Sequence, residues 1–312
     1  MSFTMADAYA FGGYTDLEAG IIKKLDEINP IAKEAIWFPV DGAAYKYRNR
    51  LSLPTTGFRH VNGTVTPSNG VINEEIEKLL ILTGEVRLDR AEVKLQGRGE
   101  KAISLKAEQY DMLVQSASNT LSQAFFEGDD IVDTASLVGL RNRATGSQVI
   151  RAATNGTALT LALLDQLVSA VPFPANGKKV LYMNRTDAMT VTTLLRAAGV
   201  SSVHLIGKPG DTGMQVDSYA GCPIRIIENT DDGVSILAKD EQCGSSAVTS
   251  SIYCVAWGAR LVKMLYGGGD KILSVEDMGE MQERRSIMGF LEFYPGLAVL
   301  HNRAMARLRG IT

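Results

Sequence analysis

Apolar residues recur at steps of three and four along the segment from Ser104 to Glu127. This spacing puts one apolar stripe on a helix of 3.6 residues per turn. Gly128 can end the helix, because glycine accepts the left-handed conformation that often follows a last helical turn. The sequence therefore predicts an amphipathic rod of about 22 residues, roughly 33 Å long. Its predicted buried stripe consists of Tyr110, Leu113, Val114, Ala117, Leu121, Ala124 and Phe125.

A second amphipathic helix is predicted from Thr15 to Asn29. Thr15 and Glu18 have the spacing of a capping box, and Pro30 blocks continuation. The apolar stripe consists of Leu17, Ile21, Leu25 and Ile28. The loosely patterned sequence on either side indicates an arm, so the stripe needs a partner surface on its own body or on a neighbouring subunit.

The segment from Ala43 to Val65 has the pattern of a long basic hairpin. Tyr45 and Tyr47 alternate with Lys46 and Arg48, as in a two-faced strand. Residues 54–57 predict a turn, after which Phe58 and His60 resume the extended chain. The segment has too few apolar residues to stabilise itself with a core of its own.

The remainder alternates helices and strands and then becomes mainly extended, which predicts an α+β protein. Helices are predicted at 158–171 and 186–198, and strands at 178–183, 203–206, 224–227 and 251–258. Further extended runs are predicted at 272–278 and 287–294, and from Leu297 onward. We expect the closing antiparallel strands to pack on the rod.

Composition excludes several functional classes. The chain of 312 residues has 45% hydrophobic residues, 21% charged residues and a net charge of -3. It therefore lacks the positive field of a sequence-specific nucleic-acid-binding protein. No run of 18 apolar residues predicts a membrane span, and the first residues do not have the pattern of a secretory signal. Cys222, Cys243 and Cys254 lack metal-ligand spacing, which favours buried thiols in a reducing compartment.

Residues for catalysis are not indicated by any motif. His60, His204 and His301 are far apart in the sequence, and no GxSxG elbow is present. The glycine-rich stretch at 207–213 lacks the order of a phosphate-binding loop. We therefore predict no catalytic residue, no cofactor and no metal, although a spatial cluster of serine, histidine and aspartate stays open.

Five segments, taken in order, resemble the major capsid proteins of tailed bacteriophages, which share the Hong Kong 97-type fold. They are LPTTGFRHVN (53–62), TLSQAFFEGDD (120–130), VLYMNR (180–185), SIYCVAWG (251–258), and SVEDMGE (274–280) followed by EFYPGLAVLHNRAMARLRGI (292–311). The similarity covers most of the chain from about Tyr45 onward.

The resemblance implies a domain organisation. Residues 1–41 would be an N-terminal arm, and 42–70 an extended loop that reaches over a neighbour. Residues 71–130 and 260–312 would form a peripheral domain, with the rod (about 104–127) as its spine helix, and 131–259 an axial domain. The function implied is structural: a self-assembling icosahedral shell that encloses the genome of a double-stranded DNA phage.

The resemblance also implies partners. We expect the chain to form hexamers and pentamers with itself, and to meet a portal and a decoration protein. About 40 residues precede the hairpin, too few for a scaffolding segment, so a separate scaffolding protein is expected. Packaged DNA would lie against the shell by non-specific proximity, in a virion assembled in the host bacterial cytoplasm. The predicted inter-subunit contact residues are Leu17, Ile21, Leu25, Tyr45, Arg48, Arg50, Phe58, Arg59, Glu280, Arg284 and Arg285.

Two alternatives remain open from the sequence. One is an encapsulin-like nanocompartment shell, which would enclose cargo enzymes instead of a genome. The other is an α/β enzyme with a ligand site within residues 131–257.

Overall fold

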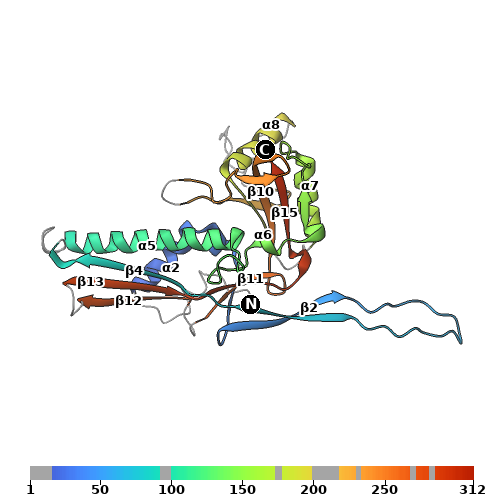
Figure 1. Ribbon diagram of the computed structural model, residues 1–312, viewed down its shortest axis with the longest axis horizontal. Coiled ribbons are helices and arrows are strands. Elements are labelled where there is room, and N and C mark those ends of the chain that lie inside the picture. The colour runs from blue at the N-terminus through green and yellow to red at the C-terminus, as the bar shows by residue number, and fades with distance from the viewer. Residues whose placement is uncertain are drawn as a thin grey trace.

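The computed structural model describes residues 16–91, 100–172, 178–198, 218–229, 233–267, 272–280 and 285–312. Its dominant element is the rod, α5 (Glu100–Glu127), which confirms the predicted helix and begins four residues earlier. Tyr110, Val114, Leu121 and Phe125 are buried, as the periodicity predicts. Figure 1 shows the rod at one end of an elongated lower tier, with an α/β unit rising above the middle.

A three-stranded antiparallel sheet lies along the rod. It consists of β4 (Leu82–Asp89), β13 (Ser286–Phe293) and β12 (Leu273–Glu280), with β13 in the centre. Glycine allows the close approach of the two layers, because a side chain at Gly289 would meet the Tyr110 ring and one at Gly84 would meet Leu113. The predicted packing of the late strands on the rod is confirmed for β12 and β13.

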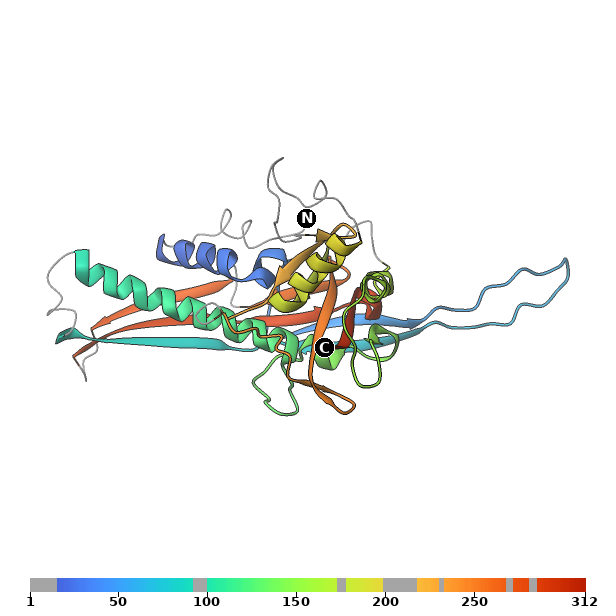
Figure 2. The same ribbon diagram turned by 90° about the horizontal axis from the view of Figure 1, so that it is seen from above.

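The arm helix lies beside the rod and packs over β12 of the same sheet (Figure 2). Helix α2 (Asp16–Ile28) buries Ile21, Ile22 and Leu25 in the same core cluster as the rod, and the short α3 (Pro30–Glu34) follows it. Thr15, the predicted capping residue, is outside the described residues. The predicted arm is therefore, from residue 16 onward, part of the folded body.

Ten of the described strands form a second, mixed sheet. Its main path runs β1 (Trp37–Pro39), β11 (Val262–Tyr266), β10 (Ser246–Trp257), β6 (Lys178–Met183), β8 (Cys222–Ile226) and β7 (Ser218–Tyr219). The strands β5 (Val149–Arg151), β9 (Glu241–Cys243), β14 (Pro295–Val299) and β15 (Met305–Ile311) pair beside this path. Two helices pack against it, α7 (Leu161–Ala170) and α8 (Arg185–Ala197). Shorter helical turns are α6 (Leu140–Arg143), η1 (Gly146–Gln148) and η3 (Asn302–Ala304).

Most predicted elements of this unit are confirmed, and the last strand is the exception. Strand β15 does not pack on the rod but pairs with β10 and β5. Its Leu308 and Ile311 join the core beneath α7 and α8, and Met305 faces the opposite core, so the strand is held from both sides. This pairing favours assigning residues 305–311 to the α/β unit, and the domain boundaries otherwise remain a proposal. The strand predicted at 203–206 lies outside the described residues.

The end of the rod connects the two sheets. Phe125 stacks on Trp257 of β10 with ring centroids 5.7 Å apart, and Phe126 packs edge-on against Tyr182 of β6. The Trp257 indole donates a hydrogen bond to the Tyr182 hydroxyl at 2.9 Å. This aromatic cluster fixes the rod to the α/β unit.

The basic hairpin exists, but with a partner strand other than the predicted one. Strand β2 (Ala44–Ser52) pairs with β3 (Val71–Lys78), and residues 53–70 between them contain no helix or strand. The predicted turn at 54–57 with a returning strand at 58–60 is therefore wrong. Pro54 has no N–H to offer a ladder, whereas the acidic β3 complements the basic β2 across the ribbon. Figures 1 and 2 show the hairpin projecting far beyond the body.

Candidate assembly interface

The root of the hairpin is fixed to the body by one face of β2. Tyr47 is buried, and its hydroxyl lies 2.6 Å from Glu75 Oε2 and 3.1 Å from the Val299 carbonyl oxygen. Burial and the neighbouring carboxylates raise the pKa of Tyr47 above its ordinary value, so the hydroxyl stays neutral. The buried Lys263 ammonium lies 3.8 Å from the Phe38 ring centroid and 4.3 Å from that of Tyr45. Residue Asn49 continues this face with a 2.7 Å hydrogen bond to Asn302.

A largely buried ion pair fixes β3 at the same place. The Arg143 guanidinium binds both carboxylate oxygens of Glu77, at 2.5 and 2.7 Å. The two side chains are only 13% and 14% exposed. Burial opposes the charge on Arg143, but the hydrogen bonds to Glu77 outweigh it and raise the pKa of Arg143 above its ordinary value. Since Arg143 also donates to the Val138 carbonyl oxygen at 2.7 Å, the body sets the direction in which the hairpin leaves it.

The opposite face of the ribbon is exposed. The ladder pairs Lys46 with Ile76 and Arg48 with Glu74, so these side chains share one face. Lys46 and Arg48 both bind the Glu74 carboxylate, at 2.7 and 3.2 Å, and their hydrogen bonds lower the pKa of Glu74. Because Ile76 is exposed among these charges, this face presents an apolar surface with a charged border.

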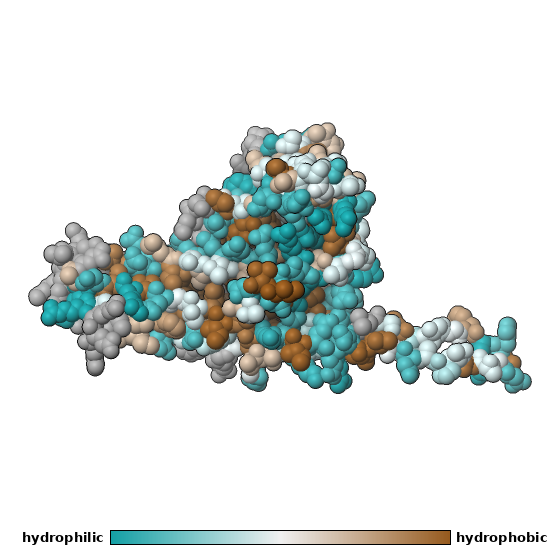
Figure 3. All heavy atoms as spheres, viewed as in Figure 1, coloured by the Kyte–Doolittle hydropathy of each residue, from teal (hydrophilic) through white to brown (hydrophobic). Residues whose placement is uncertain are grey.

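Beyond the strands, the segment 53–70, here called the tip loop, has no contact that would bury its apolar residues. Phe58 is fully exposed, Val61 is 92% exposed, and Leu53 and Val65 are also exposed. The tip loop has Arg59 as its charged residue and no acidic residue. Figure 3 shows apolar surface both on this narrow projection and on the body. Apolar residues displayed on a projection indicate a surface that binds another molecule.

The structure brings some predicted contact residues together on the hairpin. Phe58 and Arg59 lie in the tip loop, and Arg48 lies on the exposed face of the ribbon. Tyr45 lies at the root, where its hydroxyl accepts a hydrogen bond from Lys263 of its own chain at 2.9 Å. Arg50 lies in β2, and its side chain is outside those described.

The arm helix gives the clearest correction. Ile21 and Leu25 are buried in the core of their own chain, so they do not present an apolar surface to a neighbour. The reason is that α2 packs beside the rod, where Val114 and Leu121 of the rod's apolar stripe belong to the same core cluster as the stripe of α2. The side chain of Leu17 is outside those described.

Of the last three predicted contact residues, Glu280 and Arg285 lie at the same end of the three-stranded sheet. Glu280 ends β12 and its side chain is not described, and Arg284 lies outside the described residues. Arg285 is exposed, and its carbonyl oxygen accepts a hydrogen bond from the Arg90 N–H at 3.0 Å. Their role as contacts stays a prediction.

Sequence reasoning missed one surface, the turn that follows the rod. Ile131 and Val132 are 89% and 85% exposed. The turn is nonetheless ordered, because the Ile131 N–H donates to Asp129 Oδ1 and the Ala135 N–H to Asp133 Oδ1, both at 2.9 Å. The available signal was an apolar pair flanked by acids, DDIVD, in a place where turns are usually polar.

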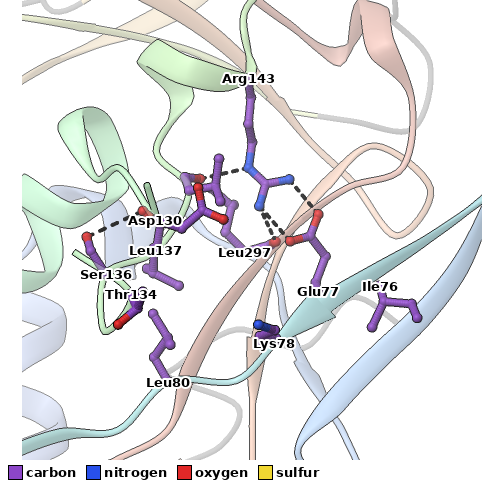
Figure 4. A pocket seen from close by; sticks show the side chains of 11 residues that line it. Ile76, Glu77, Lys78, Leu80, Asp130, Thr134, Ser136, Leu137, Arg143 and Leu297 are labelled. Atoms are coloured by element: carbon purple, nitrogen blue, oxygen red, sulfur yellow. Dashed lines mark hydrogen bonds and ion pairs between the residues drawn. The ribbon is translucent and has the colours of Figure 1, made fainter. Parts of the chain in front are cut away.

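Beside this turn lies a pocket of about 140 Å³. Figure 4 shows the Arg143–Glu77 pair on one side of it and Leu80 and Leu137 on the other. The pocket lies between the root of the hairpin and the turn, and no motif in the sequence predicts it. Its lining residues are Ile76, Glu77, Lys78, Leu80, Asp130, Thr134, Ser136, Leu137, Val138, Arg143 and Leu297.

The described residues offer little to catalysis. Among them, no three histidine, cysteine or acidic side chains are grouped so that they could hold a metal ion. The three cysteines are buried and free, as predicted, and burial raises the pKa of Cys254 to about 12, which disfavours a nucleophilic thiolate. His60 is exposed and His301 accepts the Arg303 N–H, whereas His204 is outside the described residues. Within the described part of the chain, no helix is long and apolar enough to cross a membrane.

The chain is similar to known capsid proteins in sequence and in fold. Residues 14–164 match the family model of the major capsid protein GP7. No curated protein matches the chain. The capsid of a native GTA particle aligns with a TM-score of 0.63 at 12% identity, covering 90% of this chain and 90% of that chain. Microbacterium phage Oxtober96 gives 0.59 at 15% identity and covers 98% of both chains. The holo-SrpI encapsulin complex of Synechococcus elongatus PCC 7942 gives 0.59 at 18% identity, covering 91% of this chain and 88% of that one.

The solved structures show the fold, which is that of Hong Kong 97-type capsid shells, and the family model over residues 14–164 supports a capsid shell protein with a structural role. The resemblance to major capsid proteins that the sequence indicated is therefore confirmed.

Proposed function

We propose that this chain forms the icosahedral shell of a tailed bacteriophage and encloses a double-stranded DNA genome, without catalytic activity. One observation supports this most directly. The hairpin is fixed at its root by the Arg143–Glu77 pair and Tyr47, while its tip loop displays Phe58 and Val61 to solvent. A stable subunit that holds apolar residues away from its own body is suited to bind copies of itself.

Closed symmetry makes such a projection effective. In a ring of identical chains, every hairpin can reach a neighbour and every body can receive one, so the contact repeats at each interface. We propose hexameric and pentameric rings, with the domain division given by the resemblance and residues 305–311 assigned to the axial unit. A separate scaffolding protein, a portal and a decoration protein remain predictions, as does assembly in the bacterial cytoplasm. The net charge of -3 is consistent with a container that holds DNA without condensing on it.

Assembly of the purified chain tests the proposal. The chain is expressed alone and with candidate scaffolding proteins, and its size is followed by sedimentation and electron microscopy. We expect rings or closed particles of tens of nanometres, the scale of a shell built from many such subunits. A monomer under all of these conditions would contradict the proposal.

A nanocompartment shell is the second candidate, supported by the similarity to the holo-SrpI encapsulin complex. The contents of particles purified from the native source distinguish the two candidates. Nuclease-protected double-stranded DNA favours the phage shell, and an enclosed protein cargo without DNA favours the nanocompartment.

A further inference from the structure

A fully exposed aromatic side chain and a pocket with apolar and charged walls lie on different parts of the molecule. Phe58 is fully exposed in the tip loop. The pocket lies at the root of the hairpin, with Leu80, Leu137 and Leu297 among its lining residues. We propose that Phe58 of one copy inserts into this pocket of a second copy, an inference that rests on self-assembly as the proposed function.

Size supports this pairing. The pocket measures about 140 Å³, and a cavity of about 150 Å³ is large enough for benzene, which has the ring of a phenylalanine side chain. Leu80, Leu137 and Leu297 form the apolar wall of the pocket, and the Arg143–Glu77 pair lies in its polar wall. An aromatic anchor in a preformed pocket is also the kind of contact that contributes most to protein interfaces. The tip loop therefore offers an anchor that fits the space available.

Charge supports the same orientation. Arg59 follows Phe58, and the tip loop has no acidic residue. The turn beside the pocket contains Asp129, Asp130 and Asp133. Asp129 and Asp133 are used within the turn, whereas the Asp130 carboxylate has no hydrogen-bond or ion-pair partner among the described residues. Lys78 also lines the pocket, so Arg59 is expected to bind on the side of the pocket formed by the turn.

Apolar surface continues around the pocket. Ile131 and Val132 directly follow Asp130, which lines the pocket, and both are exposed. In the tip loop, the exposed Val61 lies three residues after Phe58. Contact between these residues would bury the apolar area that both surfaces leave in water. Hydrogen bonds within the turn already fix its conformation, so binding costs little conformational entropy there.

The pairing must join two copies. Lys78 of β3 lines the pocket, and β3 runs away from it to Val71. At about 3.3 Å per residue, the strand alone carries the chain roughly 23 Å from the pocket before the tip loop begins. Figures 1 and 2 both show the tip loop directed away from the body, so Phe58 cannot reach the pocket of its own chain.

Disulfide trapping tests the contact. One preparation contains Phe58→Cys, a second contains Thr134→Cys at the pocket, and the two are mixed before assembly. The three natural cysteines are buried, so background cross-linking is low. We expect a disulfide-linked dimer of the two variants in assembled particles and none in dilute, unassembled protein. The control pairs Thr134→Cys with Val65→Cys in the same loop, which should not cross-link.

Charge exchange provides a second measurement that does not require a cross-link. Arg59→Glu should raise the concentration needed for assembly by at least about tenfold. Adding Asp130→Arg on the same chain should restore most of the assembly, because each interface then regains a pair of opposite charges. The expected effect of Phe58→Ala is a similar or larger loss, and Phe58→Leu should retain part of the assembly.

The outcomes separate this inference from the proposed function. The pairing would be overturned, and the shell function left intact, if the unsubstituted chain forms particles while two results are negative. The first is the absence of a disulfide between the Phe58→Cys and Thr134→Cys variants. The second is the failure of Asp130→Arg to restore the assembly lost in Arg59→Glu. Failure of the unsubstituted chain to assemble would instead count against the shell function itself.

Discussion

The arm helix and the hairpin were both predicted to supply contacts between subunits, and the structure separates them. Helix α2 places Ile22 and Leu25 in the core, at 1% and 2% exposure. The tip loop leaves Phe58 and Val61 in solvent. The difference is that the rod and the sheet beneath it share one apolar core with α2, whereas no described surface of the same chain covers the tip loop. An apolar segment projects only where its own body offers nothing to match it.

Polar contacts reinforce the contrast. The buried Asn29 amide donates to the Ser118 carbonyl oxygen at 3.1 Å and to the hydroxyls of Ser118 and Ser122. Its oxygen accepts the N–H groups of Ile31 and Ala32 and so caps α3. One side chain thus ties the arm to the rod, while the described contacts of the tip loop, such as Thr55 to Ser68, join the loop only to itself.

The largest expected loss of stability comes from the core that supports both regions. Phe125→Ala should lower the free energy of unfolding by about 3–5 kcal/mol, because it removes a fully buried ring stacked on Trp257. Urea unfolding followed by circular dichroism measures this. The exposed Met112→Ala on the same helix is the control and should stay within about 0.5 kcal/mol. Equal effects of the two substitutions would contradict the assigned burial.

Loosening the arm should cost less. Asn29→Ala removes the cap of α3 and leaves Ser118 and Ser122 without their shared donor, an expected loss of about 1–3 kcal/mol. Limited proteolysis should then cut α2 first. The exposed Gln123→Ala on the rod serves as the control. Unchanged protection of α2 would show that Asn29 does not hold the arm.

The attachment of the arm to the α/β unit should depend on pH. Glu34 of α3 accepts a hydrogen bond from Arg225 Nε at 2.8 Å and pairs with Lys178. Burial would raise the pKa of Glu34, but the hydrogen bonds from Lys178 and Arg225 outweigh it and hold the pKa below its ordinary value of 4.5. The stability that Glu34 contributes is therefore fully present above pH 4.5 and is lost as the pH falls through the lowered pKa.

Glu34→Gln should consequently destabilise the chain near neutral pH and make its acid unfolding less steep. Unfolding midpoints measured at about pH 7 and about pH 3 test this, since the difference between the variant and the original chain should shrink at the lower pH. The exposed Glu108→Gln should leave the pH profile unchanged. A constant difference at both pH values would rule out the assigned role of the carboxylate.

The smallest effect on the fold is expected on the hairpin itself. Arg48 is exposed and, among the described residues, binds only Glu74 of the same ribbon, so Arg48→Glu should not measurably change the unfolding midpoint. It should still impair assembly, since it reverses a charge on the surface proposed to meet a neighbour. Rescue of assembly by adding Glu74→Arg would trace the loss to the internal pair instead of the interface.

Local sequence patterns were sufficient to predict the helices and strands, because each depends on the spacing of apolar residues within its own segment. The stripe of α5 and the buried strand β6 follow from the spacing of apolar residues in the sequence. The strand pairings were harder, since β2 skips eighteen residues to find β3 and β15 joins β10 instead of the sheet on the rod. Such choices depend on long-range charge and burial that a single segment does not reveal.

Only part of the candidate interface could be predicted from the sequence, for the same reason. Phe58 and Arg59 could be selected because a core-poor hairpin must leave its side chains exposed. The pocket could not, because it forms where three distant segments meet: 76–80, 130–143 and Leu297. The burial of Ile21 and Leu25 could not be predicted either, since the packing of α2 beside the rod and over β12 becomes visible only after the fold is known.

Replacing residues 53–70 by an Asn-Gly turn that closes β2 onto β3 tests the central claim most directly. The account predicts a folded subunit with an unchanged unfolding midpoint that forms no closed particles in electron micrographs, under conditions in which the full chain does. Normal particles from the shortened chain would contradict the account, because the tip loop would then have no part in joining the copies.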